Sequence, residues 1–269
     1  MTIIEKFISS KTSNPEMCED GLVITDDIIA VIDGVTSKSN NLFEGKKGGR
    51  YCKDFIVRVV DSGMYSTENA ESFFTSVNNQ LKEEIISKFF DIEYIEWPRA
   101  SMIVYCKKLN EIWSYGDCQC MINGENFSEV KKIDELTSQM RAVNLELALL
   151  KGVSTEALRN DDVGRKAILS ILKEQVYFEN TDSEYGYPVI NGQKINSKLI
   201  RSYNVKKGDE VILASDGYPV LRQNLAESEK ELEKILKNDP MCFRMFKSTK
   251  GIENGNLSFD DRTYCRFMI

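Results

Sequence analysis

The chain has 269 residues, of which 42% are hydrophobic and 29% charged, and it carries a net charge of −7 with no histidine. This length and composition are typical of a soluble globular protein that can bury its own core. The absence of histidine excludes Ser-His-Asp and Cys-His catalysis and histidine-ligated zinc. The acidic balance argues against nucleic acid as a partner, which would need a basic face.

Membrane and export signals are not apparent in the sequence. No stretch approaches the roughly 20 apolar residues that a membrane-spanning helix needs, and the first residues lack the apolar segment of a signal peptide. The seven cysteines are scattered without a CxxC pair, which favours reduced thiols in a cytoplasmic protein. We therefore expect a cytoplasmic protein with no membrane partner. Because nothing resembles a linker, residues 1–269 are expected to form a single domain.

Periodic patterns of apolar residues predict strands and helices along the whole chain. In chain order these are strands 22–25 and 28–32, helices 48–61 and 68–90, strands 101–106, 111–115 and 118–122, helices 134–150 and 166–177, strands 199–205 and 209–214, helix 227–237 and strand 264–269. Thr67 is the expected N-cap of the second helix and Gly152 the expected C-cap of the third, and Asn123-Gly124 predicts a tight turn. The grouping favours an α+β fold: a central β-sandwich of two antiparallel sheets flanked by helices, in α-β-β-α layers.

Acidic residues stand where several apolar runs end or begin. One run leads into Asp33-Gly34, another into Asp216-Gly217, and Asp260-Asp261 precedes the closing strand. Aspartates that leave buried strands together form a compact negative pocket. Crowded carboxylates repel one another unless a cation lies between them, and oxygen ligands suit hard ions such as Mg²⁺ or Mn²⁺. Each Asp-Gly pair alone is more often a simple turn, so the inference depends on their combination.

The order of these motifs resembles that of the protein phosphatase 2C family of metal-dependent Ser/Thr phosphatases, in its bacterial form. The matching positions are Glu19-Asp20, Asp33-Gly34, Gly116-Asp117, Ser215-Asp216-Gly217 and Asp261-Arg262. The flanking residues 101–104, 113–118 and 207–217 are also similar to the family's pattern. The resemblance covers roughly the whole chain in the family's order, which chance Asp-Gly pairs would not give.

This resemblance implies a binuclear site at one end of the sandwich, with two Mn²⁺ or Mg²⁺ ions. The metal ligands it implies are Glu19, Asp20, Asp33, Gly34, Asp117, Asp216 and Asp261. Within this set, Asp33, Asp216 and Asp261 are the expected catalytic residues. A water held between the ions would attack the phosphorus of phosphoserine or phosphothreonine in a phosphoprotein substrate. A third ion near Asp117 is left open, because no acidic residue follows the Ser-Asp-Gly motif.

The sequence departs from the family where the phosphate is usually bound. An arginine normally precedes the acidic pair, but this chain has Ser13-Asn14-Pro15-Glu16 there. The phosphate-binding residue is therefore unknown, and Lys46, Lys47 and Arg50 are the nearest basic candidates, although they also fit a solvated helix start. This departure keeps open a pseudophosphatase, which would act as a binding or regulatory module. A metal-independent hydrolase with two catalytic carboxylates is a third reading.

Two cysteine patterns are expected to be coincidental. Cys52 and Arg58 have the Cys-x5-Arg spacing of cysteine-dependent phosphatases, but the residues between them fit a helix and lack the glycines of a phosphate loop. Cys118 and Cys120 alternate along a predicted strand, so both should face the core as small hydrophobic residues.

Overall fold

The fold is described here from a computed structural model that covers all 269 residues. Ten strands form two five-stranded sheets in which every neighbouring pair is antiparallel. The first sheet has the order β1 (Thr2–Ser9), β10 (Arg262–Met268), β9 (Glu210–Ala214), β6 (Gln119–Ile122) and β7 (Glu125–Phe127). The second has the order β2 (Asp20–Ile24), β3 (Ile28–Gly34), β4 (Ala100–Cys106), β5 (Glu111–Tyr115) and β8 (Arg201–Asn204).

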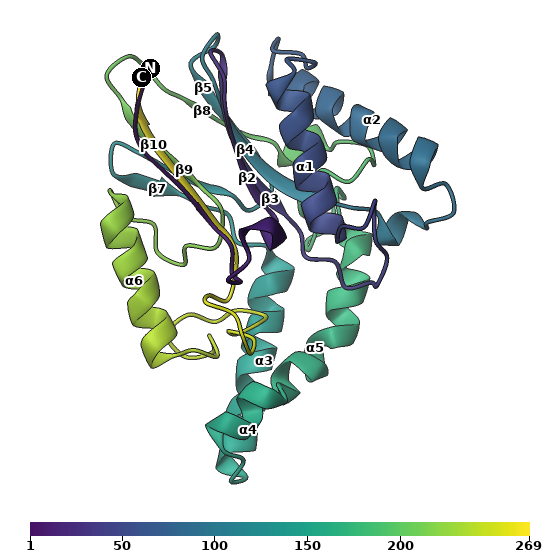
Figure 1. Ribbon diagram of the computed structural model, residues 1–269, viewed down its shortest axis with the longest axis vertical. Coiled ribbons are helices and arrows are strands. Elements are labelled where there is room, and N and C mark those ends of the chain that lie inside the picture. Colours follow the sequence, from purple (N-terminus) through teal and green to yellow (C-terminus); the bar gives the residue numbers. More distant parts are fainter.

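The two sheets pack face to face with helices on their outer faces (Figure 1). Between the sheets lies an apolar core that includes Val31, Ile103 and Leu213. Helices α1 (Gly48–Asp61) and α2 (Ala70–Lys88) cover the second sheet, and α6 (Leu225–Asn238) covers the first. This confirms the predicted α+β sandwich with α-β-β-α layers. None of the helices combines the length and apolar content that crossing a bilayer requires.

Three further helices extend beyond one end of the sandwich (Figure 1). They are α3 (Lys132–Leu150), α4 (Thr155–Asn160) and α5 (Val163–Glu174). The fully buried Arg141 in α3 fixes them to the chain that leads from α6 to β10, because its guanidinium donates to the carbonyl oxygens of Met241 (2.7 Å) and Ser248 (2.9 Å). The same guanidinium pairs with Asp162 at 2.7 Å, just before α5. The helical insert and the 241–250 segment therefore form one wall at this end of the sandwich.

The second helix begins differently from the prediction. Its N-cap is Asn69, not Thr67. The Asn69 side chain accepts the backbone N–H of Ser72 at 2.8 Å, and the Ser72 hydroxyl accepts the N–H of Asn69 at 3.1 Å. Both partners of this capping box are polar residues that satisfy free N–H groups at the helix start. The Asn123-Gly124 turn is confirmed, with φ of 51° and 88°. The C-cap of α3 is Lys151 and not the predicted Gly152, which follows it with φ of 87°.

The cysteines are all free and buried. Cys118 and Cys120 lie in the core between the sheets, as predicted. Cys52 lies within α1, where burial raises the pKa of its thiol. A raised pKa is the opposite of what a nucleophilic thiolate needs, so the spacing from Cys52 to Arg58 is not a phosphate-binding loop.

Candidate metal centre

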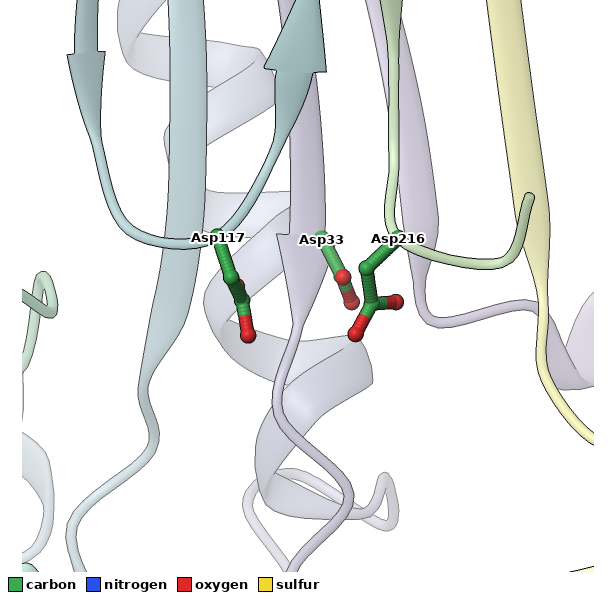
Figure 2. Close-up of side chains that lie close together, drawn as sticks. All are labelled: Asp33, Asp117 and Asp216. Carbon is green, nitrogen blue, oxygen red and sulfur yellow. The ribbon is translucent and has the colours of Figure 1, made fainter. Parts of the chain in front are cut away.

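Three aspartates from separate strand ends meet at the end of the sandwich that carries the helical insert. Asp33 is the penultimate residue of β3, Asp117 lies in the turn between β5 and β6, and Asp216 follows β9 by two residues. Figure 2 shows their carboxylates pointing into one space. One carboxylate oxygen from each lies within 4.8 Å of the others. Side chains that are distant in the sequence are thus close enough to share one cation.

Asp33 and Asp216 have no basic partner among the ion pairs of the structure. Burial, with the nearby charge of Asp216, raises the pKa of Asp33 well above its ordinary value. Burial together with Asp117 and Asp260 raises the pKa of Asp216 to about 7. Two neighbouring carboxylates without a basic partner repel each other when both are ionised. A bound cation would remove that repulsion.

Asp20 is paired directly with Asp33 across β2 and β3, so the two side chains lie side by side on one face of the sheet. It is 3% exposed, burial raises its pKa, and its Oδ2 has no hydrogen-bond partner. Glu19 beside it is engaged differently, because its Oε2 accepts hydrogen bonds from Lys11 Nζ (3.0 Å) and Thr36 Oγ1 (2.5 Å). Neither acid lines the cavity into which Asp33 opens. Both were predicted as metal ligands.

The structure corrects the prediction for the acidic pair before the last strand. Asp260 lines the cavity, whereas Asp261 does not. Asp261 is 3% exposed, and its two oxygens accept the backbone N–H groups of Lys11 (2.7 Å) and Glu19 (3.1 Å). Asp261 therefore holds together the backbone segments before β2. The sequence predicted Asp261 as a cavity carboxylate, but the neighbouring Asp260 is the residue that lines the cavity.

Two of the cavity carboxylates are already neutralised by lysines. Asp117 pairs with Lys131 at 2.6 Å and accepts a hydrogen bond from Ser101. Asp260 pairs with Lys250 at 2.6 Å. Burial alone would raise the pKa of both acids, but the lysine charges hold both pKa values below the ordinary value. Of these four aspartates, only Asp33 and Asp216 therefore lack a lysine partner.

Gly34 is required by close packing and not by a turn. It lies inside β3, paired with Ala100, and a Cβ on it would come within 2.3 Å of the carbonyl oxygen of Gly49. A Cβ on Gly49 would in turn come within 2.7 Å of Glu19 Oε1. The start of α1 therefore rests directly on the strand end that carries Asp33. The glycine of the Asp-Gly motif is needed here because only a residue without a Cβ allows the two backbones to come this close.

The predicted basic residues do not reach the cavity. Lys46 and Arg50 flank Asp54, at 2.8 and 3.6 Å, and the Lys47 ammonium donates to the carbonyl oxygen of Ser39 at 3.5 Å. The basic residues that line the cavity are instead Lys11, Lys38, Lys131, Arg165, Lys247 and Lys250. No motif marks them in the sequence, because they lie in loops and at helix starts that only the tertiary fold brings together.

The residues present fit a hard divalent cation. Carboxylate oxygens supply all the converging ligand atoms, and the centre contains neither a histidine nor a free thiolate. Mg²⁺ and Mn²⁺ prefer such oxygen donors. The unpartnered oxygen of Asp20 and the raised pKa values of Asp33 and Asp216 show where positive charge is missing. The cavity, of about 450 Å³, leaves room for a further ligand above these acids.

Replacing Lys131 should tighten metal binding. Its ammonium lies 2.6 Å from Asp117 and 5.1 Å from the centre of the Tyr187 ring, so it competes with any cation for that carboxylate. We expect Lys131→Met to raise Mn²⁺ affinity by roughly tenfold, measured by calorimetric titration, because Asp117 then has no other counter-charge. The matched control is Lys132→Met, since Lys132 pairs with Glu184 at the surface. Equal affinities of the two variants would contradict this competition.

The metal-free protein should lose stability as the pH rises. The pKa of Asp216 is raised to about 7 and that of Asp33 is also raised, so between pH 4 and 7 the folded state binds more protons than the unfolded chain. The free energy of unfolding then falls with increasing pH. We expect chelator-treated protein to melt at a higher temperature at pH 5.5 than at pH 8. A smaller difference in Asp216→Asn would assign the effect to this carboxylate, and a higher melting temperature at pH 8 would contradict it.

Comparison with solved structures identifies the fold. Over its whole length, the chain is similar to the serine/threonine phosphatase Stp1 from Staphylococcus aureus, with a TM-score of 0.52, 12% identity and 95% of that chain covered. It is also similar to the catalytic domain of the serine/threonine protein phosphatase PstP in complex with two manganese ions, with a TM-score of 0.50, 11% identity and both chains fully covered. No protein-family model and no curated protein sequence matches it. The chain therefore has the fold of the protein phosphatase 2C family.

Proposed function

We propose that this protein is a metal-dependent phosphomonoesterase that hydrolyses phosphoserine or phosphothreonine in phosphoprotein substrates. The observation that carries this proposal is the meeting of Asp33, Asp117 and Asp216 at one end of the sandwich, with two of the three lacking a basic partner. Phosphoryl transfer depends on positioning and charge neutralisation more than on a nucleophilic side chain. A chain without histidine is suited to that chemistry.

The aspartates of the cavity would hold the metal ions, and a lysine beside them would contact the substrate. Asp33, Asp117, Asp216 and Asp260 would hold two Mn²⁺ or Mg²⁺ ions from the cavity side, with Lys131 competing for Asp117, and Asp20 would lie beside Asp33. When bound, such ions supply positive charge at the phosphoryl group and acidify a water. Lys11 lines the same cavity and would give the substrate phosphate a positive contact. Its ammonium lies 3.0 Å from the Glu19 carboxylate, 3.4 Å from Asp260 and 3.3 Å from Asp261.

Lys11 stays protonated at any pH at which the enzyme would work. Burial alone would lower its pKa, but the carboxylates of Asp260, Glu19 and Asp261 outweigh burial and raise it. A permanently charged ammonium at this point can balance part of the negative charge of a phosphate. It also explains how the protein could bind a phosphate without an arginine before the acidic pair.

Hydrolysis of p-nitrophenyl phosphate tests the proposal. We expect turnover with Mn²⁺ or Mg²⁺, none after chelation, and none from the Asp216→Asn variant under any of these conditions. Turnover that persists after chelation would contradict the metal-dependent mechanism. Absence of turnover with every ion, from protein shown to be folded, would point to a binding or regulatory module that keeps the fold without the activity.

A further inference from the structure

The cavity that holds the aspartates also has basic residues along its lining. Lys38 comes from the loop after β3, Arg165 from the first turn of α5, and Lys247 and Lys250 from the segment between α6 and β10. These three segments are far apart in the sequence and belong to different parts of the fold. A single cavity therefore offers carboxylates suited to metal and cations suited to an anion.

Most of these cations have no carboxylate partner. Lys250 is neutralised by Asp260 at 2.6 Å. Lys38, Arg165 and Lys247 form none of the ion pairs found in the structure, whereas the other two cavity lysines, at positions 11 and 131, are both paired. Lys38 and Lys247 are exposed and Arg165 is half-buried, so all three charges are accessible to a ligand of opposite charge. This part of the lining is therefore suited to an anion.

Lys38 is exposed at the edge of the cavity and has no carboxylate partner. Its ammonium donates to the carbonyl oxygen of Thr36 at 2.9 Å, which is a neutral acceptor. Lys250 and Arg165 place further positive charge near it, and the carboxylates of Asp134 and Asp260 offset this only in part. An anion bound among these side chains would reverse the repulsion.

Arg165 is arranged in a similar way. One guanidinium nitrogen donates to the carbonyl oxygen of Thr249 at 2.5 Å, and no carboxylate pairs with the group. Burial, followed by the charge of Arg141, lowers its pKa. The remaining N–H groups are free to bind a carboxylate or phosphate in the two-point geometry that guanidinium groups favour.

We propose that Lys38 and Arg165 bind an acidic side chain of the substrate, so that the preferred substrates are phosphoproteins with acidic residues near the phosphorylated serine or threonine. This inference rests on the proposed function, because it assigns the phosphate itself to the neighbouring aspartate centre. The net charge of −7 would repel acidic partners over most of the surface. The attraction therefore has to be local, and these side chains supply it beside the aspartate centre.

Peptide binding tests the inference without requiring hydrolysis. The probes are two fluorescent peptides with an unphosphorylated serine, one flanked by Asp and Glu and the other by Asn and Gln, followed by anisotropy at low salt with Mn²⁺ present. We expect wild-type protein to bind the acidic peptide roughly tenfold more tightly than the neutral one, and Arg165→Gln and Lys38→Gln each to lose most of that preference. The matched control is Lys166→Gln, which removes a charge from the same helix but outside the cavity.

Two variants in separate segments protect the test against a folding defect in one of them. Equal binding of the two peptides by wild-type protein would overturn the inference, as would an unchanged preference in both cavity variants. Failure of the proposed function is read separately, as the absence of metal-dependent hydrolysis of p-nitrophenyl phosphate. Because the peptides carry no phosphate, their binding reports on the basic residues whether or not the enzyme turns over.

Discussion

Asp33→Asn should abolish metal-dependent hydrolysis while making the metal-free protein more stable. Asp33 is the half-buried carboxylate that lies near Asp216, Asp117 and Asp20 together, and neither of its oxygens has a basic partner. Removing its charge removes the strongest site for a cation. The loss of turnover should reach at least the 10²–10³-fold that removal of a single electrostatic stabiliser costs in enzymes. Hydrolysis of p-nitrophenyl phosphate with Mn²⁺ measures this loss.

The same substitution should act in the opposite direction on stability without metal. An amide is close in size to a carboxylate but carries no charge, so the repulsion that raises the pKa of Asp33 disappears. We expect a higher urea midpoint for chelator-treated Asp33→Asn than for chelator-treated wild type at pH 8. Asp27→Asn is the matched control, because Asp27 lies at the other end of the same strand pair and is exposed. If Asp33→Asn kept near-wild-type turnover, the metal-centre assignment would be wrong.

Parts of the fold that bury one regular face could be predicted from the sequence. The bounds of α1 and β5 agree with the predicted 48–61 and 111–115, because their apolar positions repeat with the period of the element. The first strand, β1, was not predicted. It is an edge strand that is only half buried, and its pairing with β10 comes from the opposite end of the chain. A local sequence pattern cannot predict the pairing of two strands from opposite ends of the chain.

Some residues of the candidate site could be predicted from the sequence and others could not. Asp33 and Asp216 were predicted because each follows an apolar run that the fold buries. The choice between Asp260 and Asp261 could not be made, since adjacent residues point to different sides and only the tertiary packing decides which one faces the cavity. The cavity lysines and Arg165 could not be predicted either, because each is placed by a loop or a helix start. The local sequence therefore predicts the aspartates, but it does not predict the basic residues that surround them.

Gly34→Ala should strongly destabilise the protein near the site. The added methyl would meet the Gly49 carbonyl oxygen at 2.3 Å and the Glu19 carbonyl oxygen at 2.7 Å. Both neighbours are backbone atoms in packed elements, so they cannot turn aside as a flexible side chain could. Overpacking of a core typically costs 1–3 kcal/mol, and we expect about 3 kcal/mol or more here. Urea unfolding of the metal-free protein measures the change.

Gly48→Ala provides the matched control for this prediction. A Cβ on Gly48 would approach nothing closer than 3.6 Å, although this glycine is next to Gly49 in the same helix. We expect it to be neutral, or stabilising by up to ~1 kcal/mol, because alanine restricts the unfolded chain more than glycine does. If Gly34→Ala unfolded at the wild-type urea midpoint, the close contact between β3 and α1 would be refuted. A weaker Mn²⁺ affinity in folded Gly34→Ala protein would show that this contact also positions Asp33, the residue directly before it.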